Sequence, residues 1–172
     1  MDDAKQKIID GLKTAMEAEA GGFHFYTMTA EHTKDPHGKE TFQALAGEEK
    51  KHLDFLSAQM KSMTETGKVD VSIKLGNQID YTEIPIFSEE IISRAGDAAF
   101  EMSALSIGMQ LEKSSIEYYT SQANLASNSG YPEVEAFYLE LVKWERKHLD
   151  ALSRQQALLK EDFWAQGGFA PF

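Results

Sequence analysis

Apolar and small residues recur at intervals of three and four along two segments in the first half of the chain. In the first segment, about residues 3–33, the pattern comprises Ile8, Leu12, Ala15, Phe23, Tyr26 and Ala30. The tetrapeptide DPHG (35–38) interrupts it, and a second pattern follows, comprising Phe42, Leu45, His52, Leu56, Met60 and Met63 and ending near Gly67. These spacings place the residues on one face of a helix, so they predict two long amphipathic helices.

The stretch after Gly67 has a different pattern. Between residues 68 and 87, polar residues alternate with the apolar Val69, Val71, Ile73 and Leu75. Gly76 and Pro85 interrupt this run, which we interpret as an extended connection. The sequence that follows, SEEIISRAG (88–96), is typical of a short helix with Ser88 as its N-terminal cap.

Two further long helices are predicted in the second half. The third extends from about Asp97 to Ser127, where SNSG stops it, and the fourth has Pro132 in its first turn and continues to about Lys160. Four helices with a long link in the middle predict an all-α four-helix bundle with one long crossover connection between helices two and three. The bundle would occupy residues 1–160, and residues 161–172 would form an aromatic, glycine-rich tail.

The two halves of the chain resemble each other. A shift of 96 positions aligns EEKKHLDFL (48–56) with WERKHLDAL (144–152); six of the nine positions are identical, and both copies contain Glu-x-x-His. A shift of 93 positions aligns residues of the first helix with identical residues of the third, among them Glu19 with Glu112 and Tyr26 with Tyr119. The sequence is therefore a duplicated helix pair.

Six acidic and histidine residues interrupt the otherwise apolar inward faces of the four helices. Helices one and three each contribute a glutamate, and helices two and four each contribute a Glu-x-x-His pair: Glu19, Glu112, Glu49–His52 and Glu145–His148. Residues three apart lie about 60° apart around a helix and roughly one turn along it. Each pair can therefore converge on one point inside the bundle.

Charge favours a metal site at these positions. Each unpaired carboxylate in an apolar core would lower the stability of the fold by roughly several kcal/mol. No Lys or Arg takes an inward position beside these carboxylates. Two divalent cations would balance the four carboxylates, which with two neutral histidines is the ligand set of a non-haem di-iron or di-manganese centre. The alternative is that the glutamates lie on an exposed face and the histidines are ordinary core residues.

The six residues and their spacing resemble the metal ligands of the ferritin-like superfamily. Tyrosines seven residues after Glu19 and Glu112 make the pattern most similar to the rubrerythrin family, over about residues 5–160. The resemblance implies a ferritin-like bundle in which Glu49 and Glu145 bridge two iron ions, and manganese is the alternative metal. It also implies that each ion is completed by one glutamate and one histidine, Glu19 with His52 and Glu112 with His148.

Residues beside the six candidates have predicted supporting roles. Tyr26 and Tyr119 lie two turns after a candidate glutamate, and helical side chains lean toward the N-terminus. Each phenol can thus donate a hydrogen bond to a candidate glutamate and act as a catalytic proton source, unless both are simply core tyrosines. Glu48 adjoins Glu49, but its counterpart in the repeat is Trp144, so the repeat selects Glu49 as the ligand.

The sequence also departs from typical rubrerythrins. Gly22 and Ser115 lie one turn beyond Glu19 and Glu112 and would leave room for an oxidant, although close helix packing explains Gly22 equally well. Typical members carry an extra glutamate at the position of Ser115, and Glu117, about 140° around the helix from Glu112, is not expected to replace it. Typical members often have a cysteine-ligated rubredoxin-like domain as well, whereas this sequence contains no cysteine.

Composition narrows the function classes. The net charge of -11 argues against a nucleic-acid partner or an anionic membrane surface, and no apolar run is long enough for a membrane span. The N-terminus, MDDAKQKIIDGLK, lacks an apolar signal region, so a cytoplasmic location is expected. Because the sequence contains no cysteine, it excludes disulfides, thiol catalysis and iron–sulfur clusters. Any metal must therefore be held by carboxylates and histidines.

The resemblance implies an oxidoreductase that reduces hydrogen peroxide or oxygen with electrons from an external donor. The alternatives are ferritin-like oxidation and storage of Fe(II), and a structural bundle with an empty or redox-inert site. Storage requires a closed shell of many chains, whereas a peroxidase works as a dimer, so a homodimer is expected. His24, His32 and His37 lie off the inward faces and are expected at the surface.

Overall fold

The computed structural model describes residues 3–81, 86–89 and 99–167. It contains four long helices, α1 (Asp3–His32), α2 (Pro36–Thr66), α4 (Ala99–Asn128) and α5 (Pro132–Gly167), and no β-strand occurs among the described residues. The predicted all-α four-helix bundle is confirmed. Within this part of the chain, no helix is both long enough and apolar enough to cross a membrane.

The predicted helix ends are close to the observed ones because local signals define them. Asp35 caps α2, and its side chain accepts a hydrogen bond from the Gly38 amide at 2.7 Å. Gly67 ends the same helix with φ 78°, a left-handed conformation that glycine adopts without strain. The exception is α5, which continues to Gly167, beyond the predicted end at Lys160, because no glycine or proline intervenes. Part of the expected tail is thus helical, and residues 168–172 lie outside the described residues.

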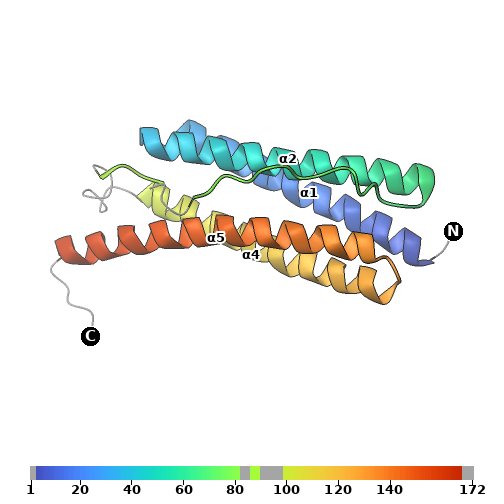
Figure 1. The fold of residues 1–172 in the computed structure, drawn as a ribbon. Helices are drawn as coiled ribbons and strands as arrows, with labels where there is room; N and C mark the ends of the chain where they lie inside the picture. Colours follow the sequence, from blue (N-terminus) through green and yellow to red (C-terminus); the bar gives the residue numbers. More distant parts are fainter. Residues whose placement is uncertain (1–2, 82–85, 90–98, 168–172) are drawn as a thin grey trace.

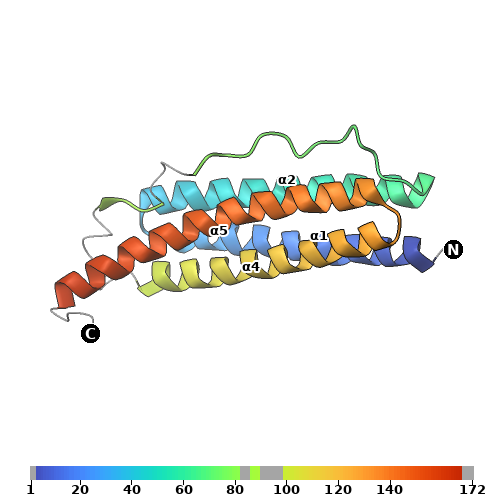
Figure 2. The same cartoon turned by 60° about the horizontal axis from the view of Figure 1, so that its bottom comes forward.

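The helices form two antiparallel pairs, α1 with α2 and α4 with α5, and α1 also contacts α4 (Figure 1). The crossover leaves the end of α2, and residues 67–81 run along the α2–α5 side of the bundle (Figure 2). Gln59 on α2 fixes its start, since its amide group exchanges two hydrogen bonds of 2.9 Å with the backbone of Asp70. Farther along, the Gln78 side chain donates to the Trp144 carbonyl on α5 at 3.0 Å.

The extended connection predicted for residues 68–87 is present as irregular backbone in its described part. Leu75 is buried as the alternating pattern predicts, but Val71 is 61% exposed because it lies in a turn at residues 71–72. The short helix predicted for residues 88–96 falls mostly outside the described residues.

The apolar core consists of two clusters separated by a polar layer. One cluster includes Leu12, Leu56, Tyr119 and Leu141, and the other includes Tyr26, Leu45, Leu105 and Leu152. On each helix, the chain passes from one cluster through the predicted glutamates and histidines to the other. The fold therefore places this polar layer inside the bundle, at mid-length of the helices.

Candidate metal centre

The structure brings the six predicted side chains together as two groups that could each hold a metal ion. One group is Glu19, Glu49, His52 and Glu145; the other is Glu49, Glu112, Glu145 and His148. Within each group, one ligand atom per residue lies within 4.8 Å of every other. The groups share Glu49 and Glu145, the two residues for which the family resemblance implies a bridging role.

All six side chains are buried. Glu49 is the most exposed of them, at 5%, and both histidines are at 0%. The alternative in which the glutamates lie on an exposed face is therefore wrong. Glu117, by contrast, is exposed, as are His24, His32 and His37, in agreement with the sequence analysis.

Both imidazoles present Nδ1 to the carboxylates. His52 Nδ1 lies 3.3 Å from Glu19 Oε2 and 3.1 Å from Glu145 Oε1. His148 Nδ1 lies 3.2 Å from Glu145 Oε2, 3.4 Å from Glu49 Oε1 and 3.6 Å from Glu112 Oε2. The two rings are stacked at a centroid separation of 5.9 Å. The same ring nitrogen of each histidine is thus available to the shared space.

Crowding of like charges shifts the pKa values of these groups. Burial, followed by repulsion from Glu19 and Glu145, raises the pKa of the Glu49 carboxyl well above its usual range. Burial and then Glu145 raise the pKa of Glu112 to about 8. Burial alone would lower the pKa of His52 and His148, but the surrounding carboxylates outweigh it and raise both pKa values well above the usual range. Without metal, protons must therefore compensate the negative charge.

The unsatisfied polar atoms of the layer fit a bound cation. Among the described residues, no donor is aligned on the buried oxygens Glu49 Oε1 and Glu145 Oε1. No Lys or Arg of the described chain pairs with the four carboxylates, whose ion pairs are with histidine. Buried carboxylate oxygens without donors are costly, and oxygen and imidazole donors together suit iron, manganese or zinc.

The two tyrosines bond across the bundle. Tyr26 on α1 donates a hydrogen bond to Glu112 on α4, and Tyr119 on α4 donates one to Glu19 on α1. Burial, with the accepting carboxylate as the next cause, raises the pKa of both phenols well above the usual range. Both hydroxyls therefore remain protonated, and each orients a carboxylate of the polar layer.

A cavity of about 290 Å³ reaches this layer from the α1–α4 side. Its lining includes Gly22, Tyr26, Glu49, Glu112 and Ser115. Gly22 also permits a close approach, since a Cβ at this position would lie 2.8 Å from Glu49 Oε2. The room expected near Gly22 and Ser115 is present, and close packing explains part of the role of Gly22.

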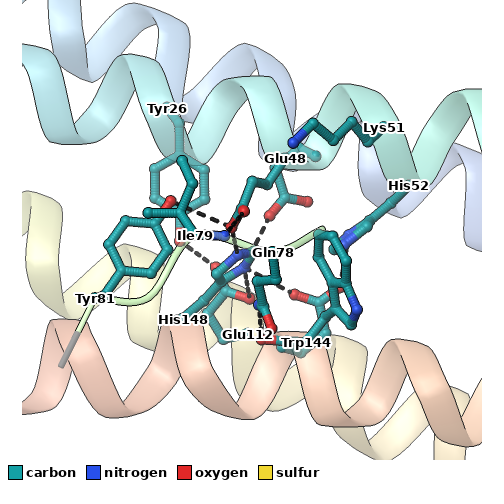
Figure 3. A network of polar contacts seen from close by, with 12 residues as sticks. Tyr26, Glu48, Lys51, His52, Gln78, Ile79, Tyr81, Glu112, Trp144 and His148 are labelled. Atoms are coloured by element: carbon teal, nitrogen blue, oxygen red, sulfur yellow. Dashed lines mark hydrogen bonds and ion pairs between the residues drawn. The ribbon is translucent and has the colours of Figure 1, made fainter. Parts of the chain in front are cut away.

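Sequence analysis missed a contribution from Glu48. This carboxylate is at 0% exposure and accepts hydrogen bonds from His148 Nε2 at 2.7 Å, the Ile79 amide at 2.6 Å and the Tyr81 hydroxyl at 3.2 Å (Figure 3). Burial alone would raise the pKa of Glu48, but these hydrogen bonds outweigh it and lower the pKa. Two of its partners belong to the irregular crossover, so no helical spacing could reveal them. The charge balance made from the sequence counted only Glu19, Glu49, Glu112 and Glu145 and omitted this further buried carboxylate.

Comparison with known proteins identifies the family. The rubrerythrin family model matches residues 10–107, more than half of the chain. Neither the curated proteins nor the solved structures gave a significant match. The family match includes Glu19, Glu49 and His52, whereas Glu112, Glu145 and His148 lie beyond it and complete the same layer through the duplicated helix pair. The chain belongs to the rubrerythrin family, within the ferritin-like superfamily.

Proposed function

We propose that this protein is a di-iron oxidoreductase that reduces hydrogen peroxide with electrons from an external donor. The observation that carries the proposal is the pair of overlapping ligand groups, which share Glu49 and Glu145 in a fully buried layer. Glu19 and His52 would hold one ion and Glu112 and His148 the other, and Glu49 and Glu145, which belong to both groups, would serve both ions. When bound, two ferrous ions supply two electrons, and reduction of hydrogen peroxide to two waters consumes those electrons and two protons.

The chain's own residues support oxidant entry from the α1–α4 side. The cavity lined by Gly22 and Ser115 reaches Glu49 and Glu112, whereas the crossover covers the α2–α5 side. Ser115 leaves space one turn from Glu112, at the position where typical members carry a further glutamate. A small, uncharged oxidant suits such a passage, because an anion would face the carboxylates of the layer.

Tyr26 is positioned to supply a proton. Its side chain lines the cavity, and its hydroxyl donates to Glu112. Tyr119 makes the equivalent bond to Glu19 but is not among the cavity-lining residues of the described chain. We therefore assign proton donation toward the oxidant to Tyr26 and the orientation of Glu19 to Tyr119.

The test is anaerobic loading with Fe(II), followed by rapid mixing with peroxide or with oxygen while absorbance is recorded. The proposal predicts about two irons per chain and faster oxidation by peroxide than by oxygen. Uptake of many irons per chain into a closed shell, with fast reaction with oxygen, would favour storage instead. Metal-dependent stability with no reaction toward either oxidant would favour a structural site.

A further inference from the structure

At one pair of corresponding positions the two halves carry different side chains, and each of these side chains contacts one of the two histidines. Glu48 in α2 corresponds to Trp144 in α5 by the 96-residue shift. Each of these residues contacts the histidine of the other half: Glu48 contacts His148, and Trp144 contacts His52 (Figure 3). Equivalent positions thus surround equivalent histidines with different chemistry.

On one side, a carboxylate fixes His148. Its Nε2 lies 2.7 Å from Glu48 Oε2, while its Nδ1 faces the shared glutamates. Glu48 is itself held in place by the Ile79 amide and the Tyr81 hydroxyl. An imidazole that donates from Nε2 to a carboxylate keeps the lone pair of Nδ1 for a metal and becomes a stronger ligand.

On the other side, His52 has no such partner. Its Nε2 is buried without a hydrogen bond from or to any described residue. The indole of Trp144 meets the ring edge-on at a centroid distance of 5.1 Å and an interplanar angle of 73°. Packing therefore restrains this ring, but nothing among these contacts strengthens Nδ1 as a ligand.

From this difference we propose that the two metal positions differ in their affinity for a metal ion. Glu48 makes the position formed with Glu112 and His148 the tighter one, and Trp144 leaves the position formed with Glu19 and His52 the weaker one. The inference rests on the proposed di-metal function. Loss of a hydrogen-bonded partner behind a ligand histidine typically lowers metal affinity by about 10- to 100-fold, which sets the expected gap between the two positions.

The experiment titrates the metal-free full-length chain with Co(II) under anaerobic conditions, using calorimetry and the visible absorption of bound Co(II). Two binding steps separated by about tenfold or more are expected. The tighter step should persist in Glu19→Gln and disappear in Glu112→Gln, which assigns it to the His148 side. The opposite assignment would overturn the inference.

Two variants test the cause. Glu48→Gln removes the negative charge behind His148 and turns one acceptor oxygen into an NH₂ group, so His148 Nε2 keeps at most a neutral acceptor in either orientation of the amide. We expect the tighter step to weaken by about tenfold while the weaker step is unchanged. In Trp144→Glu, a carboxylate is placed behind His52, and the weaker step should approach the tighter one.

The outcomes separate this inference from the proposed function. A merely structural role for Glu48 would lower the melting temperature and leave the ratio of the two affinities unchanged, which would overturn the inference. Two Co(II) ions bound with equal affinity would also overturn it while leaving the di-metal function intact. Absence of Co(II) binding by the unaltered protein would overturn both. If Trp144→Glu does not fold, Glu48→Gln alone decides, because it preserves side-chain volume.

Discussion

The phenol of Tyr26 on α1 donates a hydrogen bond to the carboxylate of Glu112 on α4, 86 positions later in the chain. The corresponding bond of the other half joins Tyr119 on α4 to Glu19 on α1. Each half of the duplication therefore orients a carboxylate of the other half. The cavity breaks this symmetry, since it is lined by Tyr26 and Glu112.

Replacing Tyr26 by phenylalanine should slow oxidation of the Fe(II)-loaded protein by peroxide. Removal of a positioned proton donor typically slows a reaction by about 100-fold or more. Because water in the cavity would replace part of this function, we expect the rate to fall by at least about tenfold. Tyr119→Phe is the matched control, because it removes the equivalent hydrogen bond on the side away from the cavity. Equal rates for the two variants in stopped-flow measurements would contradict the assignment of the proton donor.

Two adjacent glycines of α1 give a matched pair of substitutions. Gly22→Ala would place a Cβ 2.8 Å from Glu49 Oε2 and should displace that carboxylate, lowering Co(II) affinity and slowing the reaction with peroxide. Gly21 is exposed, and apart from its own stretch of helix backbone no atom of the described residues lies within 4 Å of an added Cβ, so Gly21→Ala should stabilise the helix by up to about 1 kcal/mol. Thermal denaturation and metal titration of both variants check this. Equal Co(II) affinities of the Gly22→Ala and Gly21→Ala variants would show that the close approach at Gly22 is not needed for metal binding.

The shared glutamates should matter for both ions at once. Glu49 and Glu145 belong to both ligand groups, so Glu49→Ala or Glu145→Ala should reduce bound iron to less than about one ion per chain. Glu117→Ala is the control, because Glu117 is exposed on α4. Metal analysis after anaerobic loading and desalting gives the answer. Unchanged iron content in both variants would remove the di-metal site from consideration.

The metal-free protein should become less stable as the pH rises from about 4.5 to about 8. Burial, followed by Glu145, raises the pKa of Glu112 from 4.5 to about 8, so the folded chain keeps a proton that the unfolded chain loses in this range. The raised pKa values of His52 and His148 act in the same direction above pH 6.5. Stability therefore falls wherever the folded state binds more protons than the unfolded state.

Metal binding should reverse this trend, because a cation replaces the protons on the ligands. The increase in melting temperature on adding Co(II) should accordingly grow between pH 5 and pH 8. Melting curves at several pH values, with and without Co(II), measure both effects. A metal-free melting temperature that rises over this interval would contradict the charge distribution described for the layer.

Helical periodicity explains why the bundle and the six candidate residues could be predicted from the sequence. Glu49 and His52 occupy successive inward positions, and each has an identical counterpart 96 residues later, so spacing and repetition identify them without tertiary information. Helix ends followed from local chemistry, as at Asp35 and Gly67. The end of α5 was missed because a helix without a stop signal continues for as long as its environment permits.

Glu48 and the cavity depend on contacts that no local pattern encodes. Glu48 is buried because residues 79 and 81 of an irregular crossover fold over it, and its partner His148 comes from the other half of the chain. The cavity exists because α1 and α4 meet at small residues such as Gly22 and Ser115. That the six predicted residues face the interior of the bundle was determined by the sequence, since helical spacing fixes a residue's face. Which histidine gains a carboxylate partner, and from which side the layer can be reached, was decided only by the packing of segments distant in sequence.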